Sequence, residues 1–401
     1  MANLIKFESI SVTEKAGLLF FLPLASGVLG RWIQGKQIYS GLDFESILCG
    51  GARAAQDQSR YAVHGDFHCG AYDAASSFIY LPWIADLGHA AVAAFGTSTV
   101  TMVWALLFTV SLAVAIYIPL LAPMSFTSRK ARLPFASLIT GSVVFWGNIA
   151  GLVYALMALS TYIAARRPAV FVSVIVFAGS IKQTWLTNLT VILLLDLPWW
   201  KRWTYFLIGA AAGLAPTLWF VVTANPAEVS AWADVTRYTA MVQTPGQGLL
   251  RWAQLLGLPP NSDWIIPLWI GFAAAMVIAG LGLVEHYRPS GRARVWLGLL
   301  IAVLIIPRIA SYDFLLFAPG IALLLDIATR AGKRLVANTV YGACVLTLII
   351  GIADSADHAI VLVTLTSSAS IMLIGLPHAR MGILAVLPNR TRKADTSYSL
   401  P

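Results

Sequence analysis

A carboxylate that opens an amphipathic segment is the first feature of this sequence that could do chemistry. Asp43 follows the first long apolar run and precedes residues 44–56, whose apolar side chains fall on one side of a helix. Such a helix lies in the plane of a membrane interface, where Asp43 could accept a proton from an acceptor hydroxyl. An Asp at a helix start is also ordinary capping chemistry, so the spacing alone leaves both interpretations open.

Two further polar stretches follow Asp43 along the chain. Tyr80 lies in the aromatic segment 78–83, which could shape a groove for a lipid chain or form a plain aromatic belt at the membrane surface. Asn148 follows Gly147 at the tip of a predicted helical hairpin. A polar side chain near membrane depth usually needs a partner, while Gly-Asn is equally a common turn.

Two cations stand at the ends of later apolar runs. Lys182, followed by Gln183, could supply a point charge to an anionic phosphate or simply snorkel to the interface. Arg308 could bind a phosphate with two parallel hydrogen bonds. We expect Asp313, which follows Tyr312 in the same short connection, to pair with Arg308 or Lys182 and hold it. Ionisable residues at the ends of membrane spans are by default candidates for a functional site. We therefore favour a functional role for Arg308 and Asp313 over a local, exposed ion pair, which would contribute little stability.

The histidines of the first polar loop are weaker candidates. His64, Asp66 and His68 could ligate a metal ion, but no other segment supplies a matching ligand. We therefore predict no metal and no cofactor, and keep His64 as a substrate-binding candidate that donates a hydrogen bond. No phosphate-binding loop, dinucleotide fingerprint or hydrolase elbow is present in the sequence.

The elements that must position these residues are membrane helices. The chain has 401 residues, of which 58% are hydrophobic and 11% charged, with a mean hydropathy of +0.77. Apolar runs of about 20 residues match a bilayer core, and the short alternating segments of a β-barrel are absent from the sequence. We predict an all-α polytopic protein with about twelve spans: 16–33, 98–121, 134–149, 150–165, 168–182, 184–198, 203–223, 264–285, 295–307, 313–328, 335–353 and 359–376.

Charge predicts the orientation of these spans. Most of the 27 Lys and Arg residues fall in every second connection, and most of the 18 acids fall in the others. Positive-inside bias therefore predicts a bacterial inner-membrane protein with both termini cytoplasmic and the polar stretches outside. The net charge of +9 then needs no nucleic-acid partner. We expect one domain over residues 1–401, with outer loops at 42–97 and 224–263 and a cytoplasmic tail at 377–401.

The outer loops carry two further expectations. Residues 224–263 are amphipathic and aromatic, which predicts interfacial helices that could cap a cavity. Cys49 and Cys69 share the first loop. In an oxidising compartment they could form a disulfide, or they could remain two thiols.

Taken in chain order, these stretches resemble the GT-C polytopic glycosyltransferases, and more narrowly glycosyltransferase family 87, the polyprenyl-phosphate-mannose-dependent mannosyltransferases. The resemblance covers roughly residues 12–330. The stretches that carry it are Asp43-Phe44, Phe78-x-Tyr80-x-Pro82, Gly147-Asn148, Lys182, and Pro307-Arg308 with Tyr312-Asp313. Each motif alone has low specificity. The set is moderately specific, because the motifs occur in the family's order along the chain and are all predicted on the same side of the membrane.

The resemblance implies a GT-C fold, a sugar donor on a polyprenyl phosphate, an inverting transfer and no metal. Asp43 would be the general base, Lys182 and Arg308 would hold the donor phosphate, and Asn148 would help bind the sugar. Tyr312 and Asp313 would shape the site. Asn148 stands where the family often has Gln and Ala150 where it often has Asn, which leaves the sugar open. The chain is short for the family, which implies a simpler acceptor site.

Two other functions would use similar residues. A transporter or flippase for a lipid-linked sugar should carry ionisable residues at mid-span and polar groups on both faces, and this sequence has few. A polymerase or ligase of surface polysaccharide would take a pyrophosphate-linked donor. We therefore favour a hexosyltransferase whose partners are a polyprenyl-phosphate sugar, a lipid or glycan acceptor and the surrounding membrane lipids.

Overall fold

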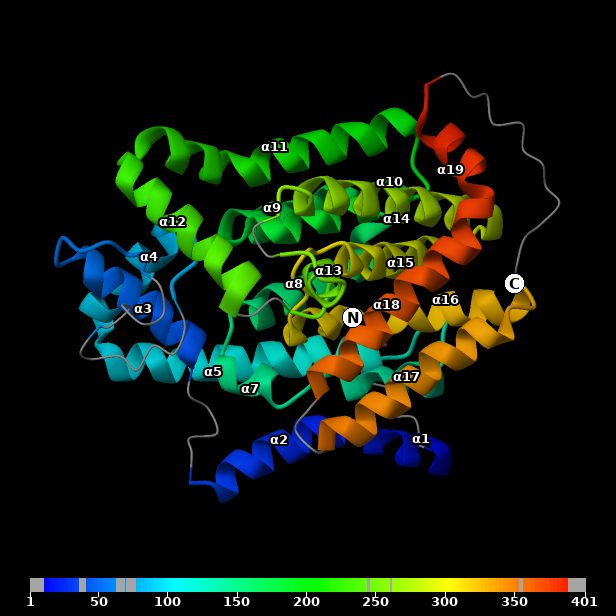
Figure 1. Ribbon diagram of the computed structural model, residues 1–401, viewed down its shortest axis with the longest axis horizontal. Coiled ribbons are helices and arrows are strands. Elements are labelled where there is room, and N and C mark those ends of the chain that lie inside the picture. Colours follow the sequence, from blue (N-terminus) through cyan, green and yellow to red (C-terminus); the bar gives the residue numbers. More distant parts are fainter. Residues whose placement is uncertain are drawn as a thin grey trace.

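The computed structural model describes residues 11–35, 41–62, 69, 77–243, 246–259, 262–352 and 356–388. Its described part is built from helices and contains no β-strand (Figure 1). His64 and the rest of the His64–His68 cluster lie outside the described residues. The α-helices are α1 (Val12–Gly17), α2 (Leu22–Ile33), α3 (Leu42–Ala54), α4 (Pro82–Phe95), α5 (Thr97–Ile116), α6 (Arg129–Arg132), α7 (Ser142–Trp146), α8 (Ala150–Ala164), α9 (Pro168–Ile181), α10 (Thr190–Leu194), α11 (Trp199–Thr223), α12 (Pro226–Tyr238), α13 (Leu249–Leu255), α14 (Ile265–Tyr287), α15 (Gly291–Leu304), α16 (Ala318–Arg330), α17 (Arg334–Ile352), α18 (Ala356–Gly375) and α19 (Ala379–Val386).

Six helical segments of the described chain are long and apolar enough to cross a bilayer. They are Val12–Ile33, Thr97–Leu121, Trp199–Thr223, Ile265–Tyr287, Arg334–Ile352 and Ala359–Val386. Large apolar side chains on their outer faces are exposed, among them Leu106 on α5 (66%) and Trp219 on α11 (72%). Lipid, not water, is the solvent that such a surface suits, so the chain has the construction of a helical membrane protein.

Two of the predicted spans contain no long α-helix. Residues 134–149 form a 3₁₀ helix, η5 (Leu133–Leu138), then the short α7, and residues 184–198 form η6 (Gln183–Leu189) and the short α10. Gly141 breaks the first segment at a point where it has no room for a Cβ against the backbone of Gly27. Both segments are largely buried by other helices, which is the condition under which non-α backbone is tolerated at membrane depth.

The predicted tail at residues 377–401 is wrong in its first part. A 3₁₀ turn, η9 (Leu376–His378), leads from α18 into α19, and α19 packs against α14. Gly282 on α14 faces Gly375 and the chain near Gly382 so closely that none of these positions has room for a side chain. Small residues allow such close approach between helices, so this end of the chain belongs to the helical body as far as residue 388.

The first predicted outer loop forms a helical pair. The amphipathic helix begins at Leu42, two residues earlier than predicted, because Gly41 adopts a left-handed conformation (φ 61°) as its N-cap. Cys49 of α3 forms a disulfide with Cys69, with 5.5 Å between the Cα atoms. Gly51 packs directly on the backbone of α4 at Ala85. The disulfide and this close packing fix α3 as a rigid element, which matters because α3 carries Asp43.

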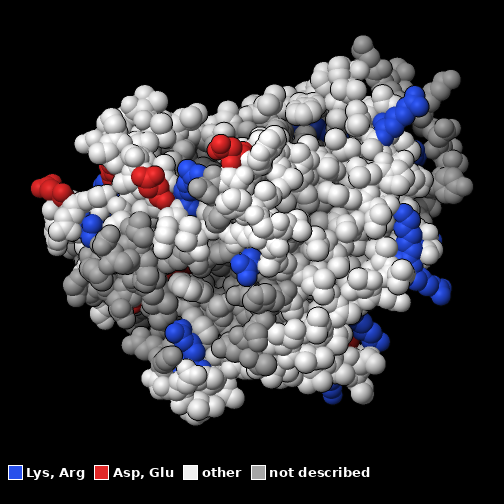
Figure 2. Space-filling model, viewed as in Figure 1, with Lys and Arg blue, Asp and Glu red and all other residues white. Residues whose placement is uncertain are grey.

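Helices do form in the predicted second outer loop, where α12, the π-helical turn η7 (Thr239–Gln243) and α13 follow one another. Figure 1 shows α3, α4 and the start of α12, where it follows α11, at the same end of the bundle. On the face seen in Figure 2, most of the acidic side chains lie toward that end with several Lys and Arg side chains among them, and a row of further Lys and Arg side chains follows the opposite edge. The charge asymmetry of the sequence is therefore also an asymmetry of the fold.

Candidate functional site

The structure brings most of the predicted site residues together at the end of the bundle that carries α3. The members of this cluster come from separate elements. Asp43 is on α3, Asn148 precedes α8, Lys182 follows α9, and the connection after α15 supplies the others: Arg308, Tyr312 and Asp313. Tyr80 joins them from the segment before α4.

Asn148 is the centre of the hydrogen bonding around Asp43. Its amide nitrogen donates to a carboxylate oxygen of Asp43, and its own oxygen accepts from the backbone N–H of Ala150 at 2.8 Å. The same amide also interacts with the hydroxyl groups of Tyr80 and Tyr312. Asn148 is only 5% exposed, so its orientation is fixed, and it fixes the orientation of the Asp43 carboxylate in turn.

The ring of Phe44 places Asp43 next to Asn148. Phe44 is buried and stacks on Trp104 of α5 with 4.6 Å between the ring centroids. The indole nitrogen of Trp104 donates to the carbonyl oxygen of Gly147 at 3.2 Å. Gly147 has a positive φ of 54°, which glycine adopts without strain. A single aromatic contact thus connects the start of α3 to the turn that presents Asn148.

Lys182 lies just past the end of α9 and points at the connection that carries Arg308. Its ammonium group donates to the hydroxyl of Tyr312 at 3.4 Å and lies 5.9 Å and 5.8 Å from the ring centroids of Trp185 and Tyr312. Burial, and then the nearby charge of Arg308, lower the pKa of Lys182 to about 8, against the opposing effect of Asp313 and Asp43. Two cations crowded together in this way favour a bound anion.

Backbone contacts with the second outer loop hold the Arg308 turn. The N–H of Gln247 donates to the carbonyl oxygen of Ile309 at 2.8 Å, and the N–H of Leu250 donates to that of Pro307 at 3.1 Å. Gly246, with a φ of 71°, lies so close to Ile309 that a Cβ there would collide with its carbonyl oxygen. The loop at 246–250 therefore supports the segment that presents Arg308.

A cavity of about 180 Å³ opens beside the two cations. Lys182 and Arg308 line it, together with Thr184 and Thr236. Most of its other lining residues are apolar and come from η7, α13 and the start of α14: Ala240, Met241, Leu250, Ile265, Ile266 and Trp269. Residues of α12, η7 and α13, all within the segment 224–263 that we expected could cap a cavity, are among its lining residues. The lining thus combines two cations with apolar side chains, which suits an anionic group attached to an apolar chain.

Asp313 has partners other than those we expected. We predicted an ion pair with Arg308 or Lys182, but the hydrogen bonds shown for its carboxylate are to the hydroxyl of Tyr154 and to the backbone N–H of Ala310, the latter at 2.7 Å. Asp313 is 3% exposed, and its charge acts on Lys182 without a direct contact being shown. Sequence analysis missed Tyr154, which sits inside an apolar helix and follows no motif.

Gln183 and Tyr80 have different positions relative to the cluster. The side chain of Gln183 donates to the hydroxyl of Thr217 on α11 at 2.5 Å, so it turns away from Lys182. The segment that carries Tyr80 is held by Tyr61, whose hydroxyl donates to the Tyr80 carbonyl oxygen at 2.9 Å, and by Trp232 of α12, which donates to Ile79 at 3.3 Å. Tyr80 is a member of the site, whereas Gln183 supports a neighbouring helix.

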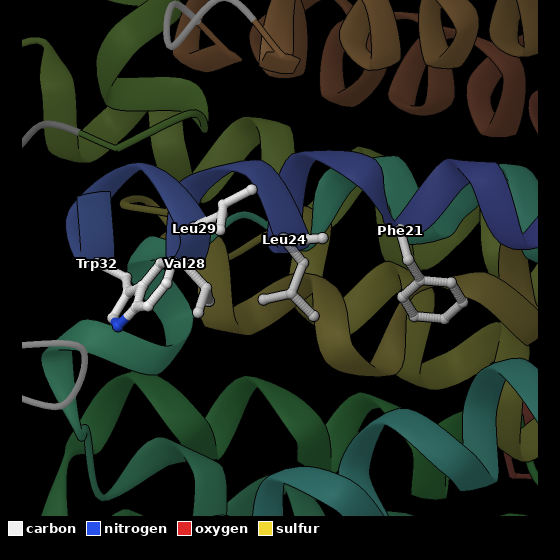
Figure 3. A pocket seen from close by; sticks show the side chains of 6 residues that line it. Phe21, Leu24, Val28, Leu29 and Trp32 are labelled. Atoms are coloured by element: carbon white, nitrogen blue, oxygen red, sulfur yellow. The ribbon is translucent and has the colours of Figure 1, made fainter.

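A second hollow lies along α2 and has a different character. It measures about 480 Å³ and is lined by Phe21, Leu24, Ala25, Val28, Leu29 and Trp32, most of which follow one side of the helix (Figure 3). No charged side chain lines it, so it offers surface for hydrocarbon rather than chemistry. Among the described residues, no three His, Cys, Asp or Glu side chains are grouped as a metal site.

The cluster at α3 is thus a carboxylate held by an amide, two cations beside a half-apolar cavity, and tyrosine hydroxyls between them. No protein-family model, curated protein or solved structure matches this chain.

Proposed function

We propose that this protein is an integral-membrane glycosyltransferase that takes a sugar from a polyprenyl-phosphate donor and attaches it to a lipid or glycan acceptor. Mannose is the sugar that the resemblance to glycosyltransferase family 87 implies. The single observation that carries the proposal is that Lys182 and Arg308 line one cavity and that the Asp43 carboxylate lies near enough for its charge to act on Lys182. The proposal includes the GT-C fold with about twelve crossings, some of them by the short and interrupted helices.

The cationic and the apolar lining residues of the cavity correspond to the phosphate and the isoprenoid chain of such a donor. The phosphate would lie between Lys182 and Arg308, as a charge-assisted hydrogen bond acceptor. The first isoprenoid units would lie against Trp269 and the other apolar residues where α14 begins. Trp264 and Ile266 at this helix start are 72% and 64% exposed, so an apolar chain leaving the cavity there would meet membrane lipid.

The reaction needs only these groups. The acceptor hydroxyl oxygen forms a bond to the anomeric carbon, the bond from that carbon to the phosphate oxygen breaks, and the hydroxyl proton passes to Asp43. General-base catalysis of this kind contributes about 10²–10⁴-fold. The departing phosphate takes the bonding electrons and gains negative charge, which Lys182 and Arg308 stabilise. Attack from the face opposite the phosphate inverts the configuration of the sugar.

We further propose that the site faces the extracytoplasmic side of a bacterial inner membrane, with both termini inside. Most of the acids seen in Figure 2 lie at the site end, whereas Lys and Arg occur at both ends and form a row along the opposite edge; positive-inside bias would produce such a row on the cytoplasmic side. The Cys49–Cys69 disulfide in the first outer loop supports the same orientation, because disulfides persist in oxidising compartments.

The test is sugar transfer from radiolabelled polyprenyl-phosphate mannose by the purified protein in lipid nanodiscs, supplied with a membrane-lipid extract as acceptor. We expect Asp43→Asn to reduce transfer by about 10²–10⁴-fold, the share of a general base. The matched control is Asp57→Asn. Asp57 is exposed on the same loop, with a φ of 56° that Asn tolerates. Equal transfer by wild type and Asp43→Asn would end the assignment.

A flippase would give a different result in the same material. It would move the lipid-linked sugar across the membrane of liposomes that contain no acceptor. Neither wild type nor Asp43→Asn would then form a labelled transfer product. Competition between monophosphate-linked and pyrophosphate-linked sugars separates the transferase from a polysaccharide polymerase or ligase.

A further inference from the structure

A buried chain of hydrogen bonds runs behind the proposed phosphate site. The indole nitrogen of Trp185 donates to the Tyr154 hydroxyl at 2.9 Å, and that hydroxyl donates to one carboxylate oxygen of Asp313. The other oxygen of Asp313 accepts from the N–H of Ala310 at 2.7 Å. Tyr154, Trp185 and Asp313 are 0%, 1% and 3% exposed. The two links made by the Tyr154 hydroxyl are therefore shielded from water, and an unpaired polar group in such buried surroundings is costly.

The two ends of this chain are the two segments that carry the cations. At one end, the backbone N–H of Trp185 donates to the carbonyl oxygen of Lys182 at 3.1 Å. At the other end, Asp313 closes the turn at Ala310, midway between Arg308 and Tyr312. The Tyr154 hydroxyl is the one atom of this chain that contacts both Trp185 and Asp313. Removing it would break this buried link between the two segments, which the contact of Lys182 with the Tyr312 hydroxyl also joins.

We propose that Tyr154 is a positioning residue, whose hydroxyl sets the separation of Lys182 and Arg308 and so tunes the site for a lipid-linked phosphate monoester or diester. This inference rests on the proposed function for the identity of the ligand. Tyr154 itself is not among the residues that line the cavity. Its influence on the anion is exerted through Trp185 and Asp313, and it touches no substrate.

The decisive variant is Tyr154→Phe, which keeps the ring and its edge-to-face contact with Trp185 (6.0 Å between centroids) and removes only the hydroxyl. A misplacement on the order of 1 Å can cost about 10²-fold, so we expect the donor KM, and the Kd for polyprenyl phosphate itself, to rise about ten- to a hundredfold. The acceptor KM should stay unchanged. A merely structural role would reduce the fraction of active protein, and thus the apparent kcat, while leaving the donor KM as in wild type.

The matched control is Tyr162→Phe, at the other end of the same helix, where the ring lies 4.1 Å from the Arg292 guanidinium and far along the chain from the site. It should leave both KM values unchanged. Trp185→Phe removes the opposite donor to the Tyr154 hydroxyl and should raise the donor KM in the same direction by a smaller factor, because Asp313 keeps its partner. Should Tyr154→Phe prove too unstable to purify, this variant decides the matter alone.

The Kd for polyprenyl phosphate, measured by tryptophan fluorescence in nanodiscs, separates this inference from the function on which it rests. Weaker binding by Tyr154→Phe in a protein that transfers no sugar would sink the glycosyltransferase proposal and leave the positioning role standing. Transfer by wild type, with donor KM and Kd unchanged in Tyr154→Phe and Trp185→Phe, would overturn the positioning role and leave the proposed function intact.

Discussion

The titration of Lys182 gives the sharpest test of how the site works. Burial and the neighbouring Arg308 lower its pKa to about 8, below the usual range of a lysine. The side chain is therefore charged below that pH and neutral above it. Since only the ammonium form holds a phosphate, kcat/KM for the donor should be constant at lower pH and fall as the pH rises through about 8.

The size of the effect follows from this pKa. At pH 9, about a tenth of the Lys182 side chains would keep their proton, so kcat/KM should lie up to about tenfold below its plateau at that pH. The decline should level off, because Arg308 stays charged throughout. A hydrogen bond to a charged group is worth about 1.5–3 kcal/mol, so the floor should lie about 10–100-fold below the plateau. Bound phosphate stabilises the ammonium form, which should move the decline in kcat to a higher pH than the decline in kcat/KM.

Two variants test whether Lys182 is the group whose titration causes this decline. Lys182→Met removes the charge at every pH, so its kcat/KM should lie at the floor and lose the decline near pH 8. Lys182→Arg keeps a permanent charge and should also lose the decline, but at a higher level of activity. Initial rates with subsaturating donor between pH 6 and 10 provide the measurement. The same alkaline decline in Lys182→Met as in wild type would refute the reasoning, because another group would then be responsible.

The remaining predictions concern the other half of the site and its frame. Asn148→Ala should lower kcat about 10–100-fold with little change in donor KM, since it removes a hydrogen bond to the charged Asp43. Asn225→Ala, which also removes a side-chain oxygen that accepts from the backbone N–H two residues on, should leave kcat unchanged, and equal losses in the two variants would contradict the assigned role. Cys49→Ser should lower the thermal stability of the outer loop, because a bridge across 20 positions contributes about 2–4 kcal/mol. Reductant should lower the Tm of wild type to that of Cys49→Ser and leave the variant itself unaffected; a Tm of wild type that ignores reductant would show that the bridge contributes nothing.

The sequence by itself determined the class of the protein and the candidates for its chemistry. Long apolar runs predict membrane helices because the bilayer core demands them, and the described part of the chain has six helical segments of that length and composition. Asp43, Asn148, Lys182 and Arg308 stood out because polar residues are rare in such a chain. Their shared position could be expected from alternating charge along the loops, since each span moves the chain to the other side of the membrane.

Which apolar segments are continuous helices was decided only by the tertiary structure. α15 is buried all round, whereas α11 exposes much of its surface. Both are apolar, because a lipid-facing side chain and a core side chain have the same hydropathy in a membrane protein. The interrupted segments at 134–149 and 184–198 looked like the others for the same reason.

The buried partners were likewise a matter of tertiary structure. Asp43 meets Asn148 across 105 positions, and Tyr154 meets Asp313 across 159. No local pattern encodes such pairs, because helix periodicity states which face a residue occupies but not which helix lies opposite. Asp313 could have satisfied its charge with Arg308 or Lys182, and the packing of α8 instead brought a tyrosine hydroxyl to it. Both cations line the cavity.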